Sequence, residues 1–113
     1  MAATLSQPRA SLHDLGCARI ERALAQRVRY RYVKPTVLRE GEAYLITSPC
    51  CSRNVDPDGG VINIALLSPL EGGGWLLCSH DHDTGQWLQH DEAPHMQPLL
   101  EEVCLDPDRV FWP

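Results

Sequence analysis

The first apolar pattern in the chain has helical spacing and begins just after Ser11. Its apolar positions recur at intervals of three to five residues, at Leu12, Leu15, Ile20 and Leu24. Ser11 and Asp14 are three residues apart and resemble the pair of side chains that caps the first turn of a helix. The pattern predicts a helix from Ser11 to about Arg27, preceded by a flexible arm over residues 1–10.

Between Val28 and His90 the pattern changes to alternation and to short apolar runs bounded by turn residues, which is typical of strands. The segments with this pattern are 28–33, with a continuation at 36–38 after Pro35, and then 43–47, 61–67, 75–80 and 86–90. The connections are short and rich in Gly, Pro and Asp, so neighbouring segments are expected to pair in antiparallel fashion. The sequence therefore predicts an antiparallel meander of four or five strands.

A second helical pattern runs from about Met96 or Pro98 to Cys104, and a short hydrophobic tail, 110–112, follows it. We therefore expect a single domain of α+β class over residues 11–113. Its N-terminal and C-terminal helices are expected to pack on one face of the sheet. The predicted core contains Leu15, Ile20, Leu24, Tyr30, Tyr32, Leu45, Ile62, Ile64, Leu66, Leu76, Trp87, Leu100, Val103 and Phe111.

This layout resembles an uncharacterised family of small bacterial α+β proteins, domain of unknown function 3024. The segments that carry the resemblance are 30–38, 75–90, 99–103, Asp106-Pro107 and Phe111-Trp112. Together they span about residues 15–113. The resemblance implies the fold of helix, Trp-bearing meander and short acidic helix, and it implies no activity.

Length and cysteine content limit the class of protein. The chain has 113 residues, enough for one domain, and 43% of them are hydrophobic. It contains no apolar run of about 20 residues, and its first residues lack the charged and apolar regions of a signal peptide. The five cysteines are an odd number, which favours thiols over disulfides. We therefore expect a cytoplasmic protein without a membrane segment.

The net charge of −5 hides a division along the chain. The part through Arg39 carries a net charge of +6, and the part from Glu40 onward carries −11. The two parts can attract each other within one fold, or the basic part can face an acidic partner. Charge alone does not decide between these interpretations.

One cluster of thiol and imidazole groups is a candidate metal site. Cys78, His80 and His82 are two residues apart, so a strand through them would place all three side chains on one face. The Cys50-Cys51 pair in a predicted loop, or His90 on the next strand, could add a further ligand for tetrahedral zinc. The alternative is a buried cysteine beside solvated histidines in a turn, because the spacing matches no C-x-x-C knuckle.

Segment 27–34 alternates basic and aromatic residues, as a binding surface for single-stranded nucleic acid would. Alternation in a strand, however, places the basic groups and the tyrosines on opposite faces, and the acidic chain as a whole repels phosphate. Nucleic-acid binding is therefore disfavoured, although it stays an alternative. The basic residues that would form such an interaction surface are Arg27, Arg29, Arg31 and Lys34.

No nucleophile, base and orienting group occur at a spacing that would bring them together, so an enzyme is disfavoured. We expect a small non-enzymatic interaction or accessory protein that works with an unknown protein partner. We expect no cofactor. If the protein does bind a metal ion, its Cys and His residues make zinc the candidate. A homodimer is left open.

Overall fold

The computed structural model describes residues 15–28, 33–49 and 60–112. In this part of the chain, helix α2 (Leu15–Leu24) precedes five strands, and helix α3 (Met96–Leu105) follows them. The strands are β1 (Thr36–Glu40), β2 (Ala43–Pro49), β3 (Val61–Pro69), β4 (Trp75–Asp81) and β5 (Gln86–Ala93). They form one sheet in the order β1-β2-β3-β4-β5, and each strand pairs antiparallel with the next. The predicted α+β meander is confirmed.

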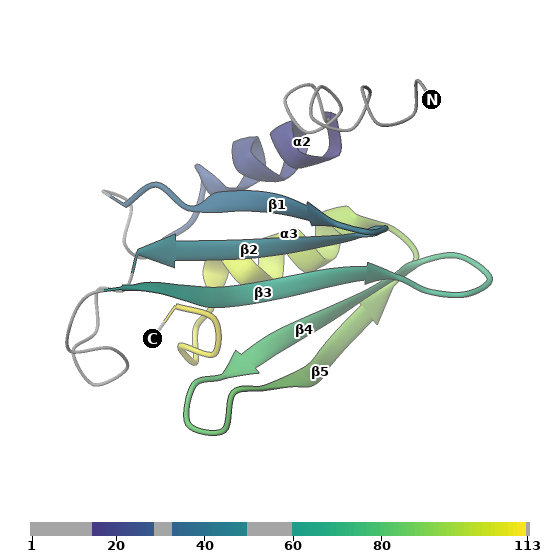
Figure 1. Cartoon of the computed structure of the whole chain (residues 1–113). Helices are drawn as coiled ribbons and strands as arrows, with labels where there is room; N and C mark the ends of the chain where they lie inside the picture. Colours follow the sequence, from purple (N-terminus) through teal and green to yellow (C-terminus); the bar gives the residue numbers. More distant parts are fainter. Residues whose placement is uncertain (1–14, 29–32, 50–59, 113) are drawn as a thin grey trace, which may run out of the picture.

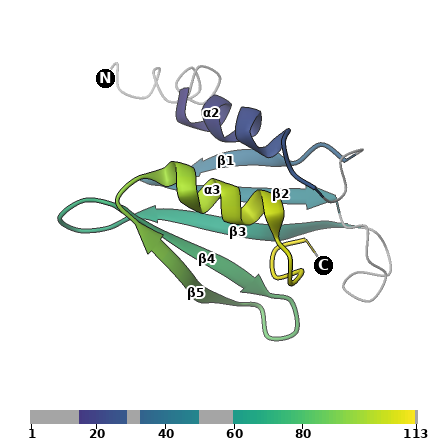
Figure 2. The same cartoon turned by 180° about the vertical axis from the view of Figure 1, so that it is seen from behind.

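Both helices lie on one side of the sheet, as expected (Figure 1). Seen from behind, α3 crosses in front of the central strands and α2 runs beside β1 (Figure 2). Neither α2 nor α3, the helices of the described ranges, has the length and apolar character needed to cross a membrane.

The core fills the space between the helices and the side of the sheet that faces them. Alternation along each strand sends every second side chain to that side, and cross-strand pairs such as Val37–Ile46 and Ile46–Ala65 stay together on it. Helix α2 contributes residues spaced by three and four positions, and α3 presents an equivalent stripe. The completely buried members are Ile20, Leu24, Ile46, Ala65, Leu67, Leu77, Leu99 and Val103.

The N-terminal part differs from the prediction in three ways. Leu15 is 83% exposed, because the stripe of α2 that reaches the core runs through Cys17, Ile20 and Leu24. The helix ends at Leu24 and not near Arg27, since the following amides bond in a tight turn. The first strand begins at Thr36, and neither Val28 nor Val33 belongs to a strand. The predicted core residues Tyr30 and Tyr32 and the arm 1–10 lie outside the described residues.

Four predicted core residues, Leu45, Leu66, Leu76 and Trp87, are only half-buried. The register places them on the side of the sheet away from the helices, because each alternates along its strand with residues that face the helices. The long apolar run in β3 conceals this, since Leu66 and Leu67 are equally apolar but point to opposite faces. The prediction that these four residues are core was therefore wrong.

Asp106 holds the C-terminal segment against the domain. It ends α3 in the left-handed conformation, with a φ of 35°, and its amide donates to the carbonyl of Glu102 at 2.9 Å. Its buried carboxylate accepts hydrogen bonds from the amides of Val110 at 2.7 Å, Phe111 at 3.1 Å and Trp112 at 2.8 Å. These bonds satisfy a charged group inside the protein, and they fold the tail back so that Phe111 and Trp112 are buried.

The ring of Trp112 then connects α3 to the turn that follows α2. Its indole Nε1–H donates to the carbonyl of Val103 at 2.8 Å, and the guanidinium of Arg27 lies 5.1 Å from the ring centroid. Arg27 also donates to the carbonyl of Leu24 at 2.9 Å and to that of Val33. A planar cation with several donors can make these contacts at once, which explains why Arg27 is only 4% exposed.

We predict that Asp106→Asn lowers the free energy of unfolding by about 2 kcal/mol, because an amide supplies only one acceptor oxygen where the carboxylate supplies two charged ones. Asparagine tolerates the left-handed conformation, so the loss reports the hydrogen bonds rather than backbone strain. Urea denaturation measures it. Asp108→Asn, an exposed change two residues along, is the control and should stay within about 0.5 kcal/mol of the parent protein. Equal effects of the two changes would contradict this role of Asp106.

Candidate functional site

A row of apolar side chains crosses the side of the sheet that faces away from the helices. The register places Leu38 opposite Leu45, Leu45 opposite Leu66, and Leu66 opposite Cys78. Cross-strand partners share a face, so the row is continuous over β1 to β4 and ends at Gln89 of β5. Leu38 is 44% exposed, while Leu45 and Leu66 are half-buried.

We call this side of the sheet the open face. It also carries Leu76 beside the row and Trp87 at the far end of the β4–β5 hairpin, both half-buried. No helix of the described ranges covers it, and Figure 1 looks directly onto it. An antiparallel sheet with one uncovered side usually presents polar residues there. The leucine row departs from that rule.

The charges on the open face are negative. Glu40 and Glu92 are the acidic residues that the register places on it, on the two edge strands at the same end of the sheet. Within the strands described, no Lys or Arg shares this face. Arg39 points to the other side, where its guanidinium lies 5.1 Å from the ring centroid of Tyr44. The open face is therefore apolar at its centre and acidic at one end.

Two of the predicted metal-ligating histidines meet at the end of β4. The Nδ1 atoms of His80 and His82 are 3.4 Å apart, and their rings make an edge contact with centroids 5.0 Å apart. The ring of Trp87 lies 4.8 Å from that of His80 on the paired strand. Asp81 does not join them: its carboxylate accepts from the amides of Asp83 and Thr84 and closes the turn.

Cys78, the third residue of the predicted metal site, has a shielded thiol. Cys78 shares the open face with His80, but it is 7% exposed and burial raises the pKa of its thiol. Desolvation, followed by the nearby His80, lowers the pKa of His82, so its ring is neutral at pH 7. The Cys50-Cys51 pair lies outside the described residues. Among those that are described, no group of three His, Cys, Asp or Glu is placed to hold a metal ion.

His90 is not near this pair, because it follows Gln89 of the open face and alternation turns it to the helix side. The register shift between Leu77 and Cys78 marks one extra residue in β5, which turns Asp91 to the helix side as well. There Nε2 of His90 lies 3.3 Å from Oε1 of Glu102 on α3, and its ring contacts that of Phe111 with centroids 5.0 Å apart. Sequence reasoning missed this contact between β5 and α3, since local patterns do not show how a helix packs across the sheet.

Glu102 holds its proton unusually well. Desolvation, the hydrogen bond with Asp91 and the negative charge of Asp91 together raise the pKa of Glu102 to about 7. The pKa of Asp91 moves down, chiefly through that hydrogen bond. Glu102 and His90 line a hollow of about 260 Å³ whose other walls are mainly apolar. One carboxyl and one imidazole in such a wall can share a proton, but none of the described residues that line the hollow with them is a Ser, Thr, Cys or Lys nucleophile.

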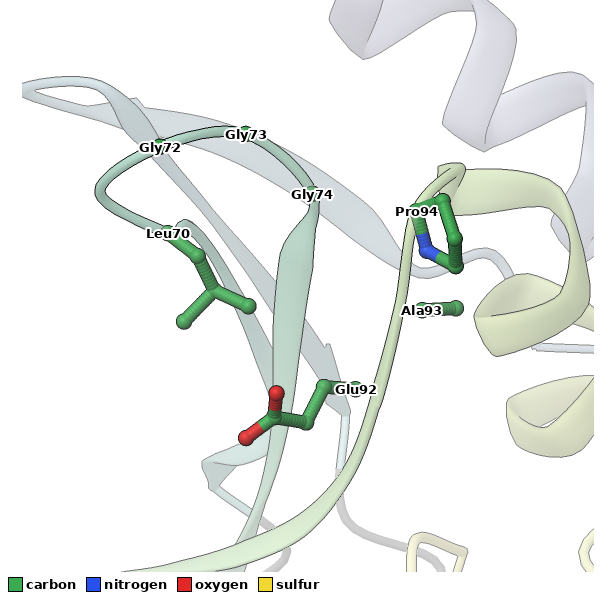
Figure 3. Close-up of a pocket in the computed structure, with 7 residues that line it drawn as sticks. All are labelled: Leu70, Gly72, Gly73, Gly74, Glu92, Ala93 and Pro94. Atoms are coloured by element: carbon green, nitrogen blue, oxygen red, sulfur yellow. The ribbon is translucent and has the colours of Figure 1, made fainter.

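A larger hollow, of about 490 Å³, lies between the β3–β4 turn and the link from β5 to α3 (Figure 3). Its wall is mostly backbone of the glycine turn 72–74, and Gly74, with a φ of +92°, leaves room where a Cβ would lie 3.1 Å from the carbonyl of Ala93. Glu92 is the one ionisable side chain on it. The described residues that line this hollow therefore provide no group of side chains for catalysis or metal binding.

Two of the four basic residues predicted as an interaction surface, Arg27 and Lys34, lie within the described ranges. Arg27 is buried against Trp112, where it serves the fold, and Lys34 is exposed. Arg29 and Arg31 lie outside the described residues. A role of these residues in binding stays a prediction.

We predict that stability falls as the pH rises from about 5 to 8, and that Glu102→Gln removes part of this fall. The folded pKa of Glu102 lies above its ordinary value, so the folded state gains stability below that ordinary value and loses it as the pH rises through about 7. Its side chain is 35% exposed, so solvent screening reduces the effect to about 1 kcal/mol. Urea denaturation over this pH range measures it.

Glu101→Gln is the matched control, because Glu101 is the exposed neighbour on the same helix. It should leave the pH dependence as it is. If Glu102→Gln and Glu101→Gln gave the same profile as the parent protein, the proposed titration of Glu102 would be wrong.

Comparison with known proteins adds the family and nothing about activity. No curated protein and no solved structure matches this chain. The family described as Domain of unknown function (DUF3024) matches residues 7–113. This span includes both helices and all five strands described above, and it confirms the resemblance seen in the sequence. The chain belongs to the DUF3024 family.

Proposed function

We propose that this protein is a non-enzymatic binding module, and that its open face takes an apolar, positively charged segment of a partner protein. The observation that carries the proposal is the continuous row of Leu38, Leu45 and Leu66 on the side of the sheet that no described helix covers. A single exposed leucine needs no explanation, but a row across neighbouring strands marks a surface that gains stability when it is covered.

The energetics favour an apolar occupant at the centre of the face. Each square ångström of apolar surface removed from water contributes about 25 cal/mol, so a leucine covered by a partner contributes roughly 1 to 2 kcal/mol. Trp87 at one end adds the large flat ring that is common where partners dock. The neighbouring Gln89 and Ser68 can bond to the polar groups of the partner at the margin.

The charge of the face favours a cationic occupant. Glu40 and Glu92 lie at its corners, and the whole chain from Glu40 onward is strongly acidic. Such a field attracts a segment that carries Lys or Arg and repels the phosphates of nucleic acid. It therefore supports a protein partner over the nucleic-acid alternative.

We propose further that the protein works in the cytoplasm, and two cysteines support both this location and a non-enzymatic role. Cys78 and Cys104 are free thiols whose pKa burial raises, so neither is poised as a nucleophile. The thiol of Cys104 instead donates to the carbonyl of Ala23 at 3.2 Å and ties α3 to α2. Thiols with this packing role persist in a reducing compartment such as the cytoplasm.

We predict that a synthetic amphipathic peptide of leucine and lysine binds the protein, and that one of equal length with glutamate in place of lysine does not. Calorimetry measures the affinity, and amide chemical shifts map the contact to the open face. Leu38→Lys should weaken binding about tenfold, because it removes an apolar contact and adds a repelling charge.

Leu88→Lys is the matched control. Leu88 is 47% exposed, close to the 44% of Leu38, but it pairs with Ser79 and belongs to the helix side of the sheet. It should leave the affinity unchanged. Equal binding of the two peptides, equal effects of the two variants, or shifts confined to α2 and α3 would each overturn the proposal. Self-association of the protein through the same face would replace it with a dimer interface.

A further inference from the structure

Two imidazole nitrogens at the end of β4 are spaced as neighbouring ligands of one metal ion. The Nδ1 atoms of His80 and His82 are 3.4 Å apart. Two nitrogens bound to tetrahedral zinc at its usual bond length are about 3.3 Å apart. The separation of the pair therefore matches one edge of a zinc tetrahedron.

The hairpin holds the two rings in this arrangement. His80 is fixed by β4 and by the edge contact with Trp87, whose centroid is 4.8 Å away. His82 belongs to the turn, and that turn is closed by Asp81, whose carboxylate accepts from the amide of Asp83 at 2.9 Å. Binding would therefore require little reorganisation of the chain, which favours affinity.

The position of His82 selects the nitrogen that would meet the ion. Its Nε2 is shielded from solvent and has no hydrogen-bond partner among the described residues. Its Nδ1 is the atom that faces His80. Both rings would thus bind through Nδ1, with the proton on Nε2.

The local charge favours a cation at this place. Asp81 and Asp83 flank His82 in sequence, and both act on its ring electrostatically. The chain has no Lys or Arg between Arg53 and Arg109, so no basic residue of its own sequence neighbourhood competes for these carboxylates.

We propose that His80 and His82 bind one divalent transition-metal ion, Zn²⁺ in the first place, through their Nδ1 atoms, with water completing the coordination shell. Imidazole selects zinc, copper and nickel over magnesium and calcium, which prefer oxygen. Two protein ligands make an open, exchangeable site, unlike the closed site with cysteine that the sequence suggested. The proposal is independent of peptide binding, and the ion would lie beside Trp87 at the margin of the open face.

The test is a calorimetric titration of the full chain with zinc chloride in buffer without chelator or reducing agent that binds metal. The expected result is one ion per chain with an affinity in the micromolar range. His80→Asn and His82→Asn should each weaken it about tenfold or more, since each removes one of two ligands. His95→Asn is the matched control, because His95 is an exposed histidine at the start of α3 without a side-chain cap bond, and it should change nothing.

A second measurement keeps the test decisive if a histidine variant folds poorly. Nitrogen-15 spectra of the histidine rings of the unaltered protein should show zinc at Nδ1 of His80 and His82. Absence of heat and of ring shifts would mean that the contact is only an imidazole hydrogen bond, and it would overturn the proposal. Zinc binding that survives the combined change of His80→Asn and His82→Asn would assign the ion to other ligands and would also overturn the proposal. Equal binding of magnesium would do the same. None of these outcomes depends on whether the leucine–lysine peptide binds.

Discussion

A five-stranded sheet has two faces, and the two helices of this domain reach only one of them. The helices are ten residues each and lie side by side on one side of the sheet, where α2 contacts β1 and α3 contacts β5. Many strand residues on that side are buried beneath them, as the complete burial of Ile46, Leu67 and Leu77 shows. The alternate residues must then be stable in another environment, and here many of them are apolar.

This constraint connects the stability of the fold to its proposed use. The domain gains its stability on the helix side, where the buried carboxylate of Asp106 and the stacked Arg27 fasten the tail containing Trp112. The open face takes little part in that network. It is therefore able to carry side chains that suit a partner, because changes there cost the core little.

Much of the fold could be predicted from the pattern of residues, and the limits of that prediction have physical causes. Element order and antiparallel pairing follow from periodicity and short turns. The face that each residue occupies could not be predicted for β3, where apolar side chains point both ways, nor for the end of β5, where one extra residue reverses the direction of Asp91. Leu15 was wrongly predicted to be buried, because an apolar stripe on a helix does not reveal how much of the helix packs against the sheet.

The candidate site was predictable in part. The two-residue spacing of Cys78, His80 and His82 indicated one shared face, and the structure places the two imidazoles in contact there. That Glu102 would meet His90 and Asp91 depends on how α3 packs across the sheet. Contacts between elements distant in sequence are set by tertiary packing, which local patterns do not encode.

The most direct test of this account is how strongly a soluble paramagnetic probe broadens the leucine methyl signals of the protein in dilute solution. The account predicts strong broadening for Leu38, Leu45 and Leu66 on the open face, and little for Leu67 and Leu77 beneath the helices. Equal protection of both sets would mean that the open face is already covered, and would contradict the central claim that it is a free binding surface.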